Sequence, residues 1–471
     1  MTAPLAGRPA VERTAAERAL DRACGARPVP GNRVAHLCDG PEAYRVMEEV
    51  IDQAGQWIHF ENYIIRNDVT GRALSERLRA AAGRGLRVRL LYDHLGSLGT
   101  SRRYWRDLRR AGVEVRAFNP ITPFHPARSL RRDHCKYVSA DGARAVLGGL
   151  CIGDEWAGRE VTGRPPWRDT AVDVAGPAVP LLEAAFARRW RSAGGPAEPD
   201  VAVTTPAPRG DASVRVIDGI PGRARLYRAI ELLVAGVADR LWITDAYLVA
   251  PTPLYAGLIS AARDGVDVRL LLPGRTDLPA VRALTRVGYR ELLQAGVRIW
   301  EWHGPMLHAK TVVADEQWFK VGSSNLNPSS LLANEELDIL VEQAEIATAA
   351  ALQFRHDLTN SVEIVLRPRR VPDRLASRIP PVVVAAGPRV PAPRGATVRR
   401  ELSRRAAVTL SQVAGGASRS IAGAIMFVSL GAAALFLALP EVMGYVVAAL
   451  CFTFGAGATW QFVRRRAYRG D

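Results

Sequence analysis

One eighteen-residue pattern occurs twice in this chain, and the repeat limits the possible folds more than any other sequence feature. The earlier copy, HCKYVSADGARAVLGGLC, begins at His134, and the later copy, HAKTVVADEQWFKVGSSN, begins at His308. In both, a lysine follows the histidine by two residues, an aspartate by seven and a Gly-Gly or Gly-Ser pair by fourteen. A pattern of this length written twice indicates an internal duplication, so we expect two equivalent halves.

The segments before each copy also match. LRAAAGRGLRVRLLYD and YWRDLRRAGVEVRAFNP precede the first copy, and LISAARDGVDVRLLLP and GYRELLQAGVRIWEW precede the second. In each half an amphipathic helix ends at glycine and leads into an apolar strand, and a second helix leads through Ala-Gly-Val into another strand. This order predicts a mixed α/β fold of two α-β-α halves, each with its own sheet covered by helices.

The repeat and the composition together divide the chain into seven parts. We expect an N-terminal extension (1–31), a first half (32–193), a connector (194–211), a second half (212–366), a basic Pro/Ala/Arg-rich linker (367–420), two transmembrane helices (421–462) and a basic tail (463–471).

The residue types in the repeat suit a phosphate group. Side chains alternate faces along a strand, so His134 shares a face with Lys136, and His308 with Lys310. An imidazole can act there as nucleophile or acid, and an ammonium can stabilise negative charge. The chain has 63 basic residues but only three lysines, the third being Lys320. Because arginine is used almost everywhere else, the compact ammonium is specifically required in the motifs.

The aspartates of the two copies have a different expected role. Asp141 and Asp315 have the opposite parity to the histidines, and each lies in a turn sequence, SADGA or ADEQW. We therefore expect them to hold the turn or to pair with a nearby arginine rather than to contact the histidines.

The pattern HxKxxxxDxxxxxxG(G/S)xN, written twice, resembles the phospholipase D superfamily over about residues 30–365. The second copy fits every position and continues as GSSNLNPSSLLANEELD, whereas GNRVAHLCDGPEAYRVMEEVIDQAGQWIHFENYII, GGLCIGDEW and WRDTAVDVAGPAV are similar to the bacterial cardiolipin synthase branch. The resemblance implies two halves facing each other across a pseudo-twofold axis, with one shared active site and neither metal nor cofactor.

The resemblance also implies roles for the motif residues. One histidine attacks phosphorus to form a phosphatidyl-histidine intermediate, and the other protonates the leaving alcohol. We assign His134 as the nucleophile and His308 as the acid and base. In the family, the lysines and asparagines of both motifs hold phosphate oxygens, a role that carries over to Lys136, Lys310 and Asn325.

Family members also use a carboxylate to orient a histidine, and Glu336 stands at that place after the second motif. The first half has Thr162 at the same offset. Asp169 in WRDTAVDV is therefore the best candidate there, with a structural salt bridge as the alternative. Ser323 and Cys151 are assigned to substrate binding.

Cys151 departs from the pattern because it stands where the second copy has Asn325. A thiol is a weak donor, so the cysteine is expected to slow the reaction without necessarily abolishing it. A zinc site built from His134, Cys135 and Cys151 is disfavoured, since strand alternation turns Cys135 away from His134.

The formal charge of +16 is concentrated near the C-terminus. Residues 367–419 have a net charge of +10 and the last eight residues one of +3, so the body of the chain is only slightly basic. Between them, 421–439 and 442–460 are uncharged runs of 19 residues separated by Pro-Glu. We interpret them as a membrane hairpin with both ends in the cytoplasm, the alternative being two buried core helices.

Five scattered cysteines and the absence of an apolar N-terminal run favour a reducing environment for the main body. The expected location is thus the bacterial inner (plasma) membrane, with the catalytic part on the cytoplasmic face.

The leading functional hypothesis is a membrane-bound phosphatidyltransferase that uses an anionic phospholipid, phosphatidylglycerol above all. A phospholipase D that transfers to water is the alternative, because the same residues serve both reactions. A nuclease is disfavoured by the slightly basic body and the hairpin, and no nucleic-acid partner is expected. An inactive membrane scaffold, marked by Cys151, is opposed by the four retained His and Lys residues.

Overall fold

A computed structural model provides the structure of the protein and describes residues 14–120, 131–196 and 205–366. These residues belong to one compact unit of the chain. The predicted membrane hairpin (421–462), with the linker and tail that flank it, lies outside them. Within the described residues, no helix combines the length and the apolar character needed to cross a bilayer.

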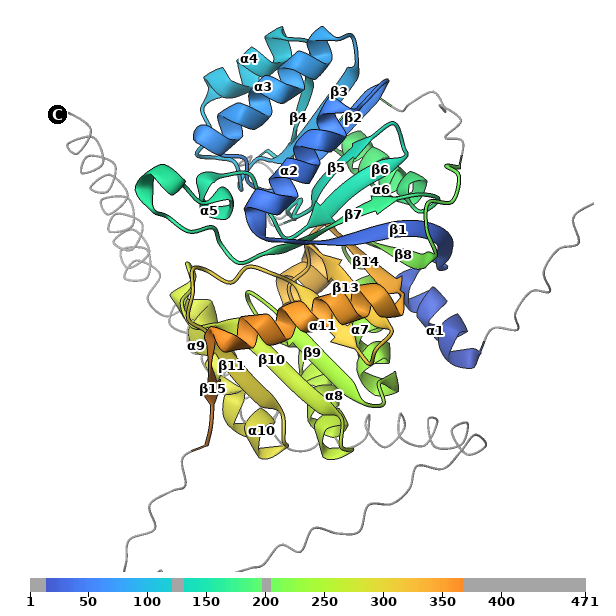
Figure 1. The fold of residues 1–471 in the computed structure, drawn as a ribbon, viewed down its shortest axis with the longest axis vertical. Coiled ribbons are helices and arrows are strands. Elements are labelled where there is room, and N and C mark those ends of the chain that lie inside the picture. The colour runs from blue at the N-terminus through green and yellow to red at the C-terminus, as the bar shows by residue number, and fades with distance from the viewer. Residues whose placement is uncertain (1–13, 121–130, 197–204, 367–471) are drawn as a thin grey trace, which may run out of the picture. The chain divides into compact units, whose positions relative to one another are not determined.

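Fifteen strands of the described residues form one continuous sheet, and the strand order repeats the duplication (Figure 1). From one edge to the centre, the first half contributes β4 (Glu114–Phe118), β3 (Arg87–Asp93), β2 (Trp57–Asn62), β5 (Lys136–Ala140), β6 (Arg144–Gly148), β7 (Thr170–Ala175) and β1 (Val29–Cys38). From the centre to the other edge, the second half contributes β8 (Ala212–Gly219), β14 (Glu336–Glu342), β13 (Trp318–Gly322), β12 (Thr311–Ala314), β9 (Arg240–Thr244), β10 (Asp267–Pro273), β11 (Arg298–Trp302) and β15 (Ser361–Ile364).

Apart from β15, each strand has a counterpart at the same position in the other half. Strands β2, β3 and β4 are parallel, as are β9, β10 and β11, and each set adjoins an antiparallel hairpin, β5–β6 or β12–β13. The repeated motif runs through these hairpins. The mixed α/β fold with duplicated halves, which the repeat predicts, is therefore confirmed.

The expectation of a separate sheet in each half was wrong, because the strands of both halves form one sheet. β1 and β8 pair antiparallel, with Val29 opposite Val214 and Asn32 opposite Ala212. An edge strand exposes unpaired N–H and C=O groups, and pairing the two central edges satisfies them. The halves therefore share one sheet.

Helices cover both faces of this sheet and create three cores. The first half contains α2 (Asp39–Asp52), α3 (Val69–Gly83), α4 (Arg102–Arg110), α5 (Asp154–Ala157) and α6 (Val179–Ser192). The N-terminal α1 (Ala15–Cys24) packs with the second half, which contains α7 (Arg225–Gly236), α8 (Thr252–Arg263), α9 (Pro279–Val287), α10 (Tyr289–Gln294) and α11 (Ala344–Thr359). The remaining short helices are η2 (Glu160–Thr162) and η3 (Ser329–Ala333).

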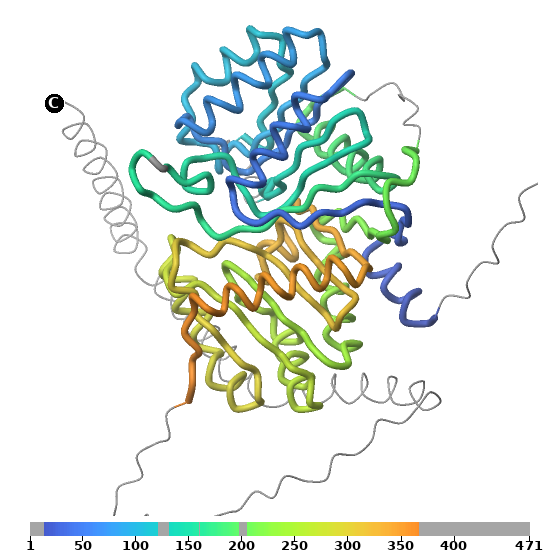
Figure 2. The backbone as a smooth tube through the Cα atoms, viewed as in Figure 1, coloured from blue at the N-terminus to red at the C-terminus, as the bar shows by residue number. Residues whose placement is uncertain are grey.

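One of these cores joins the halves. Each half has a core of its own. The core of the first half is covered by α2–α4, and that of the second half by α1, α7, α8 and α10. α6 and α11 instead contribute to a common core that contains strands of both halves. Figure 2 shows the halves following one another along the chain, the first in blue to green and the second in green to orange. Apolar burial across the boundary stabilises their relative position, on which the site depends.

Candidate active site

Main-chain hydrogen bonds between the halves bring the two motifs together. The N–H of His134 donates to the carbonyl of Glu335 at 2.9 Å, and the N–H of His308 donates to that of Arg168 at 2.7 Å. Glu336 directly follows Glu335, and Asp169 directly follows Arg168, so each bond places a predicted carboxylate next to the histidine. The two bonds are equivalent under the pseudo-twofold relation.

Each carboxylate holds the histidine of the other half. Nδ1 of His134 lies 3.0 Å from Oε2 of Glu336, and Nδ1 of His308 lies 2.7 Å from Oδ2 of Asp169. All four side chains are buried. An imidazole that donates from Nδ1 to a carboxylate has a fixed orientation and leaves Nε2 for a substrate. Both halves are therefore needed to build either His–carboxylate pair.

The strand register explains why Asp169, and not Thr162, matches Glu336. Gly148 lies opposite Ala171 and Gly322 opposite Asp338, so the residues two positions before Ala171 and Asp338 are equivalent. Seventeen residues separate Cys151 from Asp169, whereas ten separate Asn325 from Glu336. The first half has a loop longer by seven residues, which contains α5 and η2.

The motif lysines are buried beside their histidines. Lys136 Nζ donates to the carbonyl of His134 at 2.5 Å, and Lys310 Nζ donates to that of His308. Burial, together with the charge of Lys136, lowers the pKa of Lys310 to about 8. The two ammonium groups supply positive charge where a phosphate would lie between the histidines.

Two tyrosines that the sequence analysis missed flank these pairs. The ring of Tyr63 lies 4.9 Å from that of His134 and 5.1 Å from Lys136 Nζ, while the ring of Tyr247 lies 6.0 Å from that of His308 and 5.9 Å from Lys310 Nζ. Each follows the end of an equivalent strand, β2 or β9, and that recurrence is the signal that could have identified them.

Burial and neighbouring charges shift the pKa values of the histidines and of Glu336. Burial, aided by the nearby charge of Lys310, lowers the pKa of His308 to about 4, and burial also lowers the pKa of His134. Burial alone would raise the pKa of Glu336, but His134 and Lys136 outweigh it and lower that pKa to about 2. In the substrate-free site at neutral pH, both imidazoles are thus neutral. A bound phosphodiester anion would favour protonation of one of them.

One pocket of about 540 Å³ opens onto both histidines. Its wall is largely aromatic and apolar and comes from both halves. Besides the two histidines, the wall includes Tyr63, Arg66, Cys151, Trp156, Trp167, Tyr247, Leu278, Val281 and Asn325. The rings of Trp156 and Trp167 lie 5.6 and 5.7 Å from that of His308. Both tryptophans belong to the longer loop of the first half; the segments GGLCIGDEW and WRDTAVDVAGPAV contain them, but the sequence analysis gave them no role.

The asparagine and cysteine positions of the two motifs both reach this pocket. Asn325 is 3% exposed, and its Oδ1 is buried without a hydrogen-bond partner among the described residues. Such an unpaired acceptor is suited to a donor group of a bound ligand. Cys151 is 1% exposed, and burial raises the pKa of its thiol, which therefore remains neutral.

Ser323, which the sequence analysis assigned to substrate binding, contacts one of the two carboxylates. Its hydroxyl donates to Oε2 of Glu336, and it does not belong to the pocket wall described here. The serine therefore supports the carboxylate that holds His134. Its counterpart, Gly149, packs against Asp169 so closely that a Cβ there would lie 2.1 Å from Oδ1.

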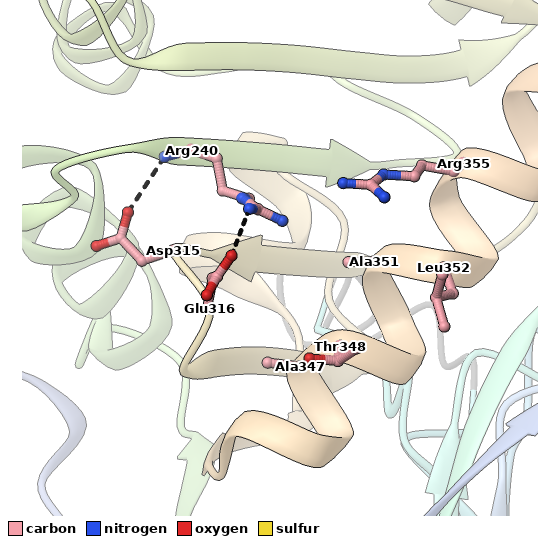
Figure 3. A pocket seen from close by; sticks show the side chains of 8 residues that line it. All are labelled: Arg240, Asp315, Glu316, Ala347, Thr348, Ala351, Leu352 and Arg355. Carbon is pink, nitrogen blue, oxygen red and sulfur yellow. Dashed lines mark hydrogen bonds and ion pairs between the residues drawn. The ribbon is translucent and has the colours of Figure 1, made fainter.

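The motif aspartates hold turns at the far ends of their strands. Asp141 accepts hydrogen bonds from the N–H groups of residues 55–57 at 2.8–2.9 Å. Asp315 accepts from those of residues 238–240, and Figure 3 shows its bond to Arg240. The backbone of both aspartates is left-handed, with φ of 54° and 50°. The hollow of about 190 Å³ in Figure 3 adjoins the Asp315 turn, at the opposite end of β12 from His308.

Replacing Asp315 with alanine is expected to lower the free energy of unfolding by about 1–3 kcal/mol, because the N–H groups of residues 238–240 lose a charged acceptor. Urea denaturation measures this change. Glu316→Ala is the matched control, since Glu316 is exposed and its ion pair with Arg240 contributes at most about 1 kcal/mol. Equal destabilisation by the two variants would contradict the turn-holding role.

Among the described residues, one buried group brings possible metal ligands together, but none of its three residues lines the pocket. Ligand atoms of Glu61, Asp133 and Cys135 lie within 4.8 Å of one another. Arg189, however, binds both carboxylate oxygens of Glu61 at 2.6 Å, and burial raises the pKa of Asp133 well above its usual range. The guanidinium of Arg189 thus balances the charge of Glu61 without a metal ion.

Comparisons with known proteins agree with this geometry. A family described as "Cardiolipin synthase, PLD-like domain" matches residues 47–154 and 233–358. The cardiolipin synthase of Halalkalibacterium halodurans is 32% identical over 338 residues, which cover 70% of this chain and 66% of the relative, just under two thirds of its length. That of Geobacillus thermodenitrificans is 32% identical, with coverage of 74% and 71%. Cardiolipin synthase A of Pseudomonas entomophila is 31% identical, with coverage of 78% and 79%.

A solved structure shows the same fold at low identity. Phosphatidylserine synthase from Haemophilus influenzae superposes with a TM-score of 0.59 at 13% identity, over 85% of this chain and all of that chain. The family match falls on both motif-bearing halves, and the Geobacillus and Pseudomonas relatives match 74% and 78% of this chain. This chain therefore belongs to the cardiolipin synthase family of phospholipase D-like proteins.

Proposed function

We propose that this protein is a membrane-bound phosphatidyltransferase that moves a phosphatidyl group from phosphatidylglycerol, or another phospholipid, to an alcohol acceptor. One observation carries the proposal: two buried imidazoles, each held at Nδ1 by a carboxylate of the other half, open onto a single pocket. With phosphatidylglycerol as both donor and acceptor, the products are cardiolipin and glycerol.

The geometry supports a two-step displacement at phosphorus. Nε2 of His134 attacks the phosphorus, the bond to the leaving oxygen breaks, and that oxygen takes a proton from Nε2 of His308. In the second step His308 removes the proton of the acceptor hydroxyl, the acceptor oxygen attacks phosphorus, and the P–N bond breaks. Lys136, Lys310 and Asn325 hold the non-bridging oxygens in both steps.

The pocket wall supports an anionic lipid as the acceptor. Arg66 lies in this wall, and its Nε is 3.7 Å from Glu155 without a hydrogen-bond partner among the described residues. A guanidinium there suits the phosphate of a second phospholipid. The rings of Trp156, Trp167 and Tyr247 restrict water near His308, which favours transfer over hydrolysis. The predicted hairpin (421–462) would keep this site at the cytoplasmic face of the bacterial inner membrane.

Product analysis tests the proposal. The full-length protein in detergent is incubated with phosphatidylglycerol, with and without a second alcohol, and the lipids are resolved by mass spectrometry. Cardiolipin or a new phosphatidyl alcohol is the expected product. Phosphatidic acid alone would instead establish the hydrolase, and the absence of any lipid product would favour the inactive scaffold.

Replacing Cys151 with asparagine is expected to raise kcat by roughly tenfold or more, because the amide would donate a hydrogen bond to a charged phosphate oxygen. Initial rates of lipid transfer measure the change. Cys151→Ala is the control for altered packing, and it is expected to stay near the rate of the unmodified enzyme. An asparagine variant slower than the alanine variant would show that this position does not contact the phosphate.

A further inference from the structure

Helix α9 (Pro279–Val287) has its apolar side turned to solvent. None of its nine residues is buried. Five of its six exposed residues are apolar: Pro279, Ala280, Ala283, Leu284 and Val287. Successive residues of an α-helix are about 100° apart, so these five lie on one continuous arc. A surface helix ordinarily presents such an arc to the core.

The polar side of α9 faces the protein because a buried carboxylate lies beneath it. Glu301 of β11 is 4% exposed and pairs with Arg286 at 2.8 Å and with Arg282 at 3.6 Å. The hydroxyl of Thr285 donates to the carbonyl of Leu248 at 2.7 Å. A buried charge needs partners: Arg282 supplies one from the inner side of the helix, and Arg286, which is itself exposed, supplies the other from the edge of the apolar arc. The apolar arc of α9 consequently faces solvent.

This arc adjoins the mouth of the catalytic pocket. Val281 of α9 and the preceding Leu278 both line the pocket. Figure 1 shows α9 beside the boundary between the halves, on the same side as α5. Other exposed apolar side chains come from segments that line the pocket, Leu332 from η3 and Val161 from the loop of Trp156 and Trp167. We define the mouth surface as Leu278, Leu284, Val287, Leu332 and Val161, whose exposed fractions are 47%, 60%, 73%, 46% and 94%.

We propose that the mouth surface inserts into the interface of an anionic phospholipid bilayer. Apolar side chains grouped at an opening indicate a binding surface, and an apolar face with arginines nearby is typical of interfacial helices. Residues 275–290 contain four arginines and one aspartate, and Arg275 and Arg290 are exposed at the two ends of this segment.

The inference rests on the proposed function, because it explains how a lipid reaches the histidines. A phospholipid can place its phosphate between His134 and His308 while its acyl chains stay in the bilayer, provided that the pocket opens at the membrane surface. Leu278 and Val281 in the pocket wall, followed by the outer arc of α9, provide apolar surface between the histidines and the bilayer.

Fluorescence in membranes tests the surface independently of catalysis. Leu284→Cys in the full-length protein is labelled with an environment-sensitive fluorophore and reconstituted into phosphatidylglycerol vesicles that contain spin-labelled lipid. Leu352→Cys on α11 is the matched control, since Leu352 is 57% exposed and lies at the distant hollow of Figure 3. The unmodified protein, labelled in parallel, gives the background of the native cysteines.

We expect lipid quenching at position 284 and none at position 352. If the emission of the label at position 284 shows an apolar environment but spin-labelled lipid does not quench it, the surface binds a protein, such as a second copy of this chain, and the proposal is overturned. Equal exposure of the two labels to water would also overturn it.

Activity on two physical forms of one substrate supplies the second test. The double variant Leu284→Glu, Val287→Glu is expected to lose about tenfold or more of the activity on bilayer phosphatidylglycerol, because carboxylates oppose insertion into an anionic interface. Its activity on a monomeric short-chain phosphatidylglycerol should stay unchanged, and Leu352→Glu should affect neither. Equal loss on both substrates would overturn the proposal. If the unmodified enzyme acts on neither substrate, the proposed function fails, while the quenching result still decides the surface.

Discussion

Alanine at His134 or His308 is expected to lower the rate of lipid transfer by about 10⁴-fold or more, because each imidazole performs a step that no neighbouring group can replace. Both side chains are buried at the shared pocket and held by carboxylates, so the loss should appear in kcat rather than in substrate binding. His303→Ala is the matched control, since His303 is exposed and lies five residues before His308. Comparable losses in all three variants would point to a general structural effect.

The two alanine variants also separate the nucleophile from the acid. A phosphodiester with a good leaving group, such as a nitrophenolate, needs no proton from His308. The His308→Ala variant should therefore still form the phosphohistidine with this substrate and accumulate it, because no base activates the acceptor. The His134→Ala variant should form none. Mass spectrometry of the rapidly denatured protein detects the adduct, and the reverse pattern would exchange the two roles.

Asp169→Asn and Glu336→Gln are expected to lower kcat by about 10²- to 10⁴-fold, because an amide cannot stabilise the imidazolium as a carboxylate does. Asp173→Asn is the control, since Asp173 is also buried on the first-half sheet but pairs with Arg33 and Arg144. This variant should lose stability while retaining the pH dependence of the enzyme.

The pH dependence distinguishes positioning from structure. An ionised carboxylate raises the pKa of the histidine it contacts, so its removal lowers that pKa further. If His308 must be protonated, the alkaline limb of the Asp169→Asn profile should move to lower pH. If His134 must be neutral, the acidic limb of the Glu336→Gln profile should move to lower pH instead. Profiles that fall in height without moving would indicate that the carboxylates only support the fold.

Much of this site could be predicted from the sequence because its residues recur at a short, fixed spacing. Each motif lysine contacts the histidine two residues before it, although both histidines come just before β5 and β12 rather than within these strands. The turn sequences around Asp141 and Asp315 indicated turns, and both aspartates lie in turns. The duplication and the α/β class follow from patterns of similar length. These features depend on neighbours a few residues apart, which the order of residues alone specifies.

The contacts that complete the site could not be predicted in this way. His134 meets Glu336 across 202 residues, and the pairing depends on bonds between the halves. Counting from the motif pointed to Thr162, because the sequence does not show that the first half has the longer loop. The register of β6 and β7 selects Asp169.

Helix α9 shows the same division between local pattern and tertiary structure. Its periodicity identifies an apolar arc and, by the usual rule, that arc would face the core. The side that faces inward is decided by Glu301, on a strand that follows the helix in sequence and lies beneath it in space. The sequence alone thus determined the repeated His–Lys pairs and the strands that follow them. Only the tertiary structure decided which carboxylate holds which histidine and which face of α9 meets solvent, because both depend on burying charge between segments that are distant in the chain.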